Sequence, residues 1–115
     1  MPTRLYCLVF DAADPSALAT WWANALGWPI TAESPDEVTI EPPAGGPGLP
    51  LIFVSVADPK RGKNRIHLDL NSRSAADQAA IVDRLTRLGA EPVDIGQGEV
   101  PWVVLADPEG NEFCV

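Results

Sequence analysis

The sequence has little positive charge and little of two side chains that often carry chemistry, histidine and cysteine. It holds eight Lys and Arg against 16 Asp and Glu, for a formal net charge of −8. That balance argues against nucleic acid as a partner, because phosphate binding needs clustered cations. The cations that do cluster are Lys60, Arg61, Lys63 and Arg65. This segment is typical of a solvated turn, and the alternative is a rim that attracts an anionic ligand.

Long apolar runs are also absent, and none approaches the ~20 residues that a membrane span requires. The first residues, Met1-Pro2-Thr3-Arg4, do not resemble a signal peptide. We therefore predict a cytoplasmic protein with no membrane partner. In that compartment the two cysteines, Cys7 and Cys114, are expected to be reduced thiols and not a disulfide.

Two segments carry the end signals of helices. Asp14 and Pro15 predict a helix start, because Asp caps the free N–H groups and Pro fits the first helical position. Gly27 predicts the end of that helix. Ser74, with Asp77 three residues later, predicts a second helix that ends at Gly89. The remaining apolar segments predict strands at 5–10, 38–40, 51–56, 65–70, 91–95, 102–106 and 111–115.

The order of these elements repeats. The two caps, Asp14 and Ser74, lie 60 residues apart, and the two glycine stops, Gly27 and Gly89, lie 62 apart. Each half is too small to bury a core alone, so the halves are expected to pack on each other or on a second chain. We predict an α+β fold in a single domain, 1–115. Its two β-α-β-β-β modules, about 1–57 and about 65–115, form a cupped mixed β-sheet around a small-molecule pocket.

Two stretches resemble a known superfamily. Residues 10–15 (FDAADP) running into 18–28 (LATWWANALGW), and residues 104–113 (VLADPEGNEF), resemble the first-module and second-module signatures of vicinal oxygen chelate proteins. That superfamily includes glyoxalase I, extradiol dioxygenases and bleomycin-resistance proteins, and this chain is most similar to its glyoxalase-like domain group. The resemblance covers essentially the whole chain. It implies the fold but no single activity, because one fold hosts many chemistries.

The resemblance also implies where a metal would bind. Such proteins commonly hold a divalent ion with two residues from each module, usually His or Gln on the first strand and a carboxylate on the last. The matching positions here are Cys7, Phe53, His67 and Cys114. His67 alone is a typical match, and Phe53 has no metal-binding atom. We therefore expect no metal, with zinc or nickel at Cys7, His67 and Cys114 as the alternative.

Strand alternation predicts the face of the pocket. It places Arg65, His67 and Asp69 on one side of their strand, and Ile66, Leu68 and Leu70 on the other side, under the second helix. Applied to the other strands, the same rule adds Cys7, Phe53, Glu112 and Cys114 to the pocket. Trp102, which begins a strand, is a further candidate contact, and packing is the alternative.

The candidate roles follow from side-chain chemistry. His67, the single histidine, and Glu112 are the candidates for proton transfer. The predicted ligand contacts are Cys7, Phe53, Arg65, Asp69, Trp102 and Cys114. The two cysteines are also typical of small buried hydrophobes, and a thiolate activated by His67 is a third interpretation.

The predicted function is binding of a small organic molecule without the usual metal. The alternative is a lyase or isomerase that uses a divalent metal, or His67 as general base. Whether the protein is an enzyme stays open, and standard glyoxalase I activity is not expected. We expect a homodimer, as the resemblance implies.

Overall fold

Residues 2–115 are described by a computed structural model, which divides the chain into two compact units. The first unit ends at Pro59 and the second is Lys60–Val115. Met1, where the segment tested for a signal peptide starts, lies outside the described residues. Among the described residues no helix is both long and apolar enough to cross a membrane.

Each unit combines a helix with a small sheet, which confirms the predicted α+β class. The first unit contains β1 (Leu8–Ala12), α1 (Pro15–Leu26), β2 (Ile30–Glu33), β3 (Glu37–Ile40) and β4 (Leu51–Ser55). The second contains α2 (Ala75–Arg87), β5 (Glu91–Pro92), β6 (Val104–Ala106) and β7 (Glu112–Cys114). That the two units form one domain stays a prediction.

Both helices begin where the sequence predicts. The Asp14 side chain accepts a hydrogen bond from the Ala17 amide at 3.1 Å, and Pro15 occupies the first helical position. Ser74 accepts from the Asp77 amide, also at 3.1 Å. Gly27 ends α1 with φ of 70°, a left-handed conformation that glycine adopts without steric cost.

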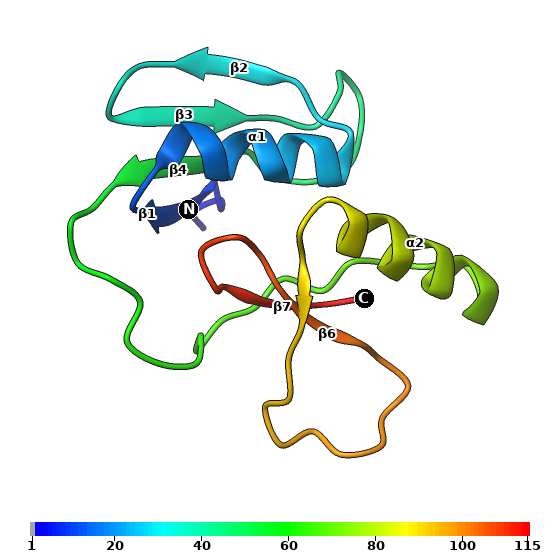
Figure 1. The fold of residues 1–115 in the computed structure, drawn as a ribbon. Helices are drawn as coiled ribbons and strands as arrows, with labels where there is room; N and C mark the ends of the chain where they lie inside the picture. Colours follow the sequence, from blue (N-terminus) through cyan, green and yellow to red (C-terminus); the bar gives the residue numbers. More distant parts are fainter. Residues whose placement is uncertain (1) are drawn as a thin grey trace. The chain divides into compact units, whose positions relative to one another are not determined.

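The first unit is a four-stranded sheet in the order β1-β4-β3-β2, with α1 lying across it (Figure 1). β1 and β4 run parallel, whereas the other neighbours are antiparallel. A parallel pair cannot be joined by a tight turn, and here α1 is part of the connection. β2 was not predicted from the sequence, because all four of its residues are exposed and it carries no apolar stripe.

The face of this sheet under α1 forms the core of the first unit. Phe53 is fully buried and stacks on Phe10, with ring centroids 5.2 Å apart. Val38, Ile40 and Leu51 on the same face are also buried, as are Leu18 and Trp22 of α1. The prediction that Phe53 faces the pocket is therefore wrong. The segment 51–56 is apolar at nearly every position, so alternation could not decide which of its faces meets the helix.

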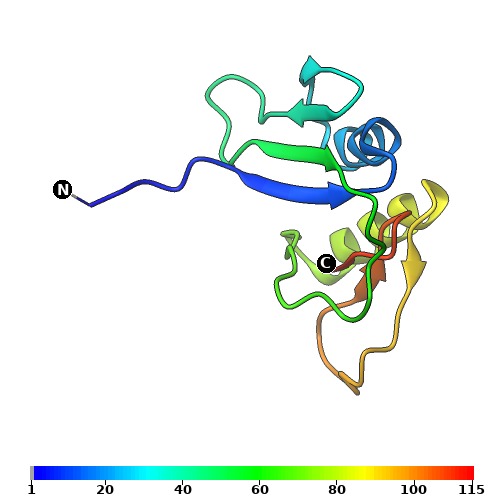
Figure 2. The same cartoon turned by 90° about the vertical axis from the view of Figure 1, so that its left-hand side faces the viewer.

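The first strand also begins later than predicted. β1 starts at Leu8 and runs to Ala12, so Leu5, Tyr6 and Cys7 precede it. Figure 2 shows this leading segment running away from the first sheet. Leu5 and Tyr6 are exposed, whereas Cys7 is half-buried.

The second unit repeats this topology with shorter strands. Its sheet has the order β5-β6-β7, and both neighbours are antiparallel. The predicted strand at 65–70 is reduced to one isolated bridge, in which Asp69 pairs in parallel with Cys114 of β7. Ile66 was expected under α2 but is 81% exposed, because the chain bends at 65–66 before it reaches the bridge. The second unit therefore keeps the strand-pairing pattern of the first unit, but its first extended segment is not a regular strand.

Candidate functional site

The site of the second unit is built where the segment 64–70 lies along β7. Cys114 donates its amide hydrogen to the Leu68 carbonyl at 2.9 Å, and its carbonyl accepts from the Leu70 amide at 2.7 Å. These two bonds hold Asp69 opposite Cys114. Residues paired across a sheet point their side chains to the same face. Val104 of β6 is the partner of Cys114 on its other side, so the row across the sheet is mixed, polar at one end and apolar at the other.

His67, Asp69 and Cys114 form a polar cluster on this face. His67 Nδ1 lies 2.8 Å from Asp69 Oδ1, and the two residues share a face because they are two apart in an extended segment. One donor atom from each of the three residues lies within 4.8 Å of the others. The imidazole is 41% exposed and the carboxylate 72%, whereas Cys114 is buried. Three of the predicted pocket residues of this module, His67, Asp69 and Cys114, thus meet, and the imidazole is accessible from outside.

The electrostatics of the cluster keep the Cys114 thiol protonated. Burial raises the pKa of Cys114, and the Asp69 carboxylate raises it further through its charge and by accepting the thiol hydrogen bond. Lys63 lowers this pKa, but by less. A thiol with a raised pKa is a poor nucleophile, since the thiolate is the reactive form. The interpretation of Cys114 as a thiolate activated by His67 therefore has no support in this geometry.

Asp69 orients the imidazole of His67. A carboxylate only accepts hydrogen bonds, so the Nδ1 of His67 is the protonated nitrogen when it bonds to Asp69. In the neutral ring Nε2 then carries the free lone pair. His67 can accept a hydrogen bond or a proton from a ligand at that atom.

Glu112 lies on the same face of β7 as Cys114 but is held by other groups. Lys60 Nζ lies 3.0 and 3.1 Å from its two carboxylate oxygens, and the Asn64 amide donates to Oε1 at 2.9 Å. Burial acts to raise the pKa of Glu112. The backbone N–H of Asn64 and the ammonium group of Lys60 outweigh that effect, so the pKa lies below its usual value. The side chain is 11% exposed. Glu112 is thus an ionised anchor for the segment 60–64, which differs from the proton-transfer role predicted for it.

The remaining predicted residues do not join this cluster. Cys7 and Phe53 belong to the first unit, and Phe53 is closed off beneath α1. Arg65 is exposed two residues before His67. Trp102 is 48% exposed and lies ahead of β6, not at its start as predicted.

The strand register also corrects the implied metal set. Val9 pairs with Ile52 in the first unit as Asp69 pairs with Cys114 in the second. The position equivalent to Cys114 is therefore Ile52, not Phe53, and isoleucine likewise has no metal-binding atom. His67, Asp69 and Cys114 do offer the nitrogen, oxygen and sulfur donors that zinc accepts. The sequence predicts Asp69 as a ligand contact but not as a metal donor, because the resemblance points to other positions.

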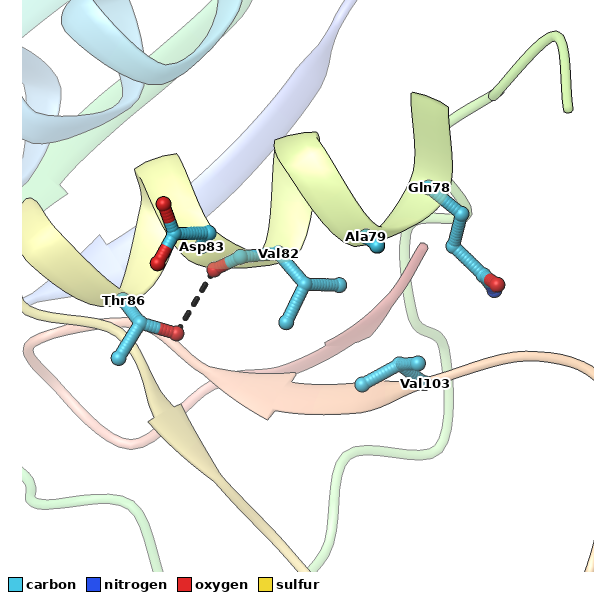
Figure 3. Close-up of a pocket in the computed structure, with 6 residues that line it drawn as sticks. All are labelled: Gln78, Ala79, Val82, Asp83, Thr86 and Val103. Atoms are coloured by element: carbon cyan, nitrogen blue, oxygen red, sulfur yellow. Dashed lines mark hydrogen bonds between the residues drawn. The ribbon is translucent and has the colours of Figure 1, made fainter. Parts of the chain in front are cut away.

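A hollow of about 460 Å³ lies between α2 and Val103, the residue before β6, in the same unit (Figure 3). Its polar side chains are already engaged. Gln78 donates to the carbonyls of Pro101 and Val115, and Thr86 donates to the Val82 carbonyl at 2.7 Å. Asp83 pairs with Arg87 on the helix. This hollow was not predicted, and it offers no converging polar groups to a ligand.

The fold and the chain's sequence agree on a family. The glyoxalase-like domain family model matches residues 7–115. The chain belongs to the glyoxalase-like domain family. No curated protein matches this glyoxalase-like domain in sequence.

Solved structures share the fold of this glyoxalase-like domain at low identity. A glyoxalase/bleomycin resistance protein/dioxygenase family enzyme from Burkholderia phytofirmans is 16% identical, with a TM-score of 0.78 over 97% of this chain and 96% of its own. A possible glyoxalase from Bacillus cereus is 16% identical, with a TM-score of 0.73 over 99% and 98% of the two chains. A mutant of the fosfomycin resistance protein FosX from Listeria monocytogenes, complexed with Mn(II) and 1S,2S-dihydroxypropylphosphonic acid, is 16% identical. Its TM-score is 0.72, over 99% of this chain and 89% of its own. The family-model match confirms the predicted glyoxalase-like group, and the structural matches confirm its fold.

Proposed function

We propose that this glyoxalase-like domain binds a small organic molecule at the face formed by His67, Asp69 and Cys114, without a divalent metal. The observation that carries the proposal is the 2.8 Å hydrogen bond between His67 Nδ1 and Asp69 Oδ1. It fixes an accessible imidazole and leaves Nε2 for a ligand. Small-ligand sites combine a few oriented polar groups of this kind with apolar neighbours, and Val104 lies beside Cys114 in the sheet.

A fragment screen tests the proposal. Binding would be detected by ligand-observed NMR on the wild-type chain, on His67→Ala and on the matched control Glu99→Gln, an exposed change in the same unit. We expect a group of fragments that binds the wild type and the control but not His67→Ala. Fragments that bind all three proteins alike would refute a site at His67.

The proposal that no metal binds rests on the chemistry of the side chains that would have to ligate it. Ile52 removes one position of the family's set, and Asp69 already accepts hydrogen bonds from the other two members of the cluster. A thiol must lose its proton to bind zinc, and the raised pKa of Cys114 opposes that loss. Where zinc or nickel does bind, His67, Asp69 and Cys114 are the residues that would hold it, and the ion would polarise a ligand oxygen.

A second candidate function is proton transfer in a lyase or isomerase. It is favoured by the His67–Asp69 pair, because a carboxylate that orients an imidazole is a recurring arrangement for a general base. Fragments found in the screen would be incubated with the protein in D₂O and followed by NMR. Exchange of a carbon-bound proton that stops in His67→Ala would make this the function, and its absence would favour binding alone.

We also propose that the protein is a homodimer in the cytoplasm. The resemblance to the superfamily supports the dimer, and the adjacent apolar side chains of Leu5 and Tyr6, 67% and 75% exposed, are available for a second copy to cover. Sedimentation at micromolar concentration would show a species of twice the chain mass. A monomer across the whole concentration range would refute the dimer.

A further inference from the structure

The cations of this acidic protein are concentrated beside the proposed site. Of eight Lys and Arg, seven lie in the second unit, and four lie within residues 60–65. The remaining cation is Arg4. A protein with a net charge of −8 does not need such a cluster of cations for solubility. The position of the cluster beside His67 therefore suggests a role in binding.

The segment that carries these cations is fixed to the strand of the site. Lys60 pairs with Glu112, and the Asn64 amide donates to the same carboxylate. Lys60 also donates to the Gly62 carbonyl, which closes the turn on itself. Glu112 is two residues from Cys114 on one strand, so the two side chains share a face of β7. The anchor therefore holds the segment 60–65 next to the cluster.

Lys60 neutralises Glu112, but the other three cations are not neutralised. Among the described residues, Arg61, Lys63 and Arg65 form no ion pair, and Lys63 donates to the Asn64 carbonyl alone, at 3.2 Å. Lys63 also lowers the pKa of Cys114, which shows that its charge is felt at the thiol. Arg65 lies in the same segment as His67, two residues before it. Positive charge without a protein partner thus borders the cluster on this side.

We propose that the small molecule bound at this site carries an oxyanion, a carboxylate or a phosphoryl group, and that Lys63 and Arg65 bind it. This inference rests on the proposed function and names its ligand class. The planar guanidinium of Arg65 presents parallel N–H donors that match two oxygens of a carboxylate or phosphoryl group. His67 then contacts a neutral polar atom of the same molecule through Nε2. The negative charge of the rest of the chain disfavours anions elsewhere on its surface.

Three probes with one ring and different head groups test this inference. Benzoate, phenyl phosphate and benzamide would each be titrated into the ¹⁵N-labelled full chain, and the amide shifts of residues 63–69 and 112–114 followed. We expect saturable shifts with one or both anions and much weaker shifts with benzamide. Arg65→Gln and Lys63→Gln should each weaken anion binding by about tenfold, the value of one charged hydrogen bond. Arg4→Gln makes the same change in net charge in the other unit and should have no effect.

The outcomes separate this inference from the proposed function. Binding of benzoate alone, or of phenyl phosphate alone, supports it and identifies the head group. Equal binding of benzamide and the anions, unchanged in Arg65→Gln, overturns it while leaving a small-molecule site at His67. Absence of shifts with both anions also overturns it, and the fragment screen with His67→Ala then decides the proposed function by itself. The wild-type-like amide spectrum of each variant confirms that folding is intact.

Discussion

Asp69 lies opposite Cys114 in the second unit just as Val9 lies opposite Ile52 in the first. The two pairs occupy the same place in the repeated topology, where the first extended segment of each half meets the last strand in parallel. In one pair a carboxylate accepts the hydrogen bond of a thiol, and the other pair is aliphatic. The duplicated backbone therefore carries two different surfaces, and the polar cluster lies on the second.

The pairing predicts how the Cys114 thiol titrates. Asp69→Asn removes the carboxylate charge that raises the pKa of Cys114, so the thiolate should form at lower pH than in the parent chain. The measurement is the rate of alkylation by iodoacetamide against pH, in a Cys7→Ser background so that one thiol reports. Glu99→Gln removes an exposed charge of the same unit and should leave the profile unchanged. An Asp69→Asn profile that overlays the parent would contradict the contact.

The Glu112 anchor predicts a stability that depends on pH. Glu112→Gln leaves Lys60 without its partner and should lower the free energy of unfolding at pH 7 by about 2 kcal/mol. Because the folded pKa of Glu112 is lowered, the carboxylate stabilises the fold above its unfolded pKa and loses that effect as pH falls. The difference between the variant and the wild type in urea unfolding should therefore shrink in acid.

The control for the anchor is the double variant Lys60→Gln/Glu112→Gln. If the two groups act through each other, its loss will be smaller than the sum of the single losses. Strictly additive losses, or a difference between wild type and Glu112→Gln that is the same at acid and neutral pH, would argue against the ion pair.

The packing under α1 predicts which side of β4 carries the stability. Phe53→Ala should cost about 4 kcal/mol in urea unfolding, because it opens a cavity at a fully buried ring. Ile52→Ala, one residue earlier on the opposite face, should cost less, since Ile52 is half-buried. A larger loss of stability in Ile52→Ala than in Phe53→Ala would indicate that Phe53 lies on the open face of the sheet.

The metal-free proposal predicts the composition of the purified protein. Elemental analysis of chain purified without chelator should find zinc and nickel at well below one ion per chain, about a tenth or less, because the site lacks a full set of deprotonated donors. Addition of EDTA should leave the melting temperature unchanged. Stoichiometric metal that disappears in His67→Ala would overturn the proposal.

Much of the fold could be predicted because its signals are local. Asp14 with Pro15, Ser74 with Asp77, and Gly27 mark helix ends within a few residues of chain. The nearly equal spacings of the caps and the glycine stops, 60 and 62 residues, revealed the duplication without any knowledge of tertiary contacts. The resemblance to vicinal oxygen chelate proteins led to the same topology.

The parts that were missed depend on distant partners. Which side chains of 51–56 are buried depends on which face of the strand α1 covers. Nearly every residue of this segment is apolar, so the sequence does not distinguish the two faces. Glu112 has a carboxylate suited to catalysis, but Lys60, 52 positions away, turns it into an anchor. His67 and Asp69 could be placed together because they are two residues apart, whereas the contact with Cys114 needed the register of β7.

The parallel pairing also has a consequence for the rate of folding. Val9 and Ile52 are 43 residues apart in the chain, and Asp69 and Cys114 are 45 apart. Each half must therefore close a loop of most of its length before its central pair can form, and loop-closure entropy opposes that step. Chains dominated by such distant pairings fold slowly for their size. We expect refolding in milliseconds to seconds, with the helices formed before the pairs that complete the two sheets.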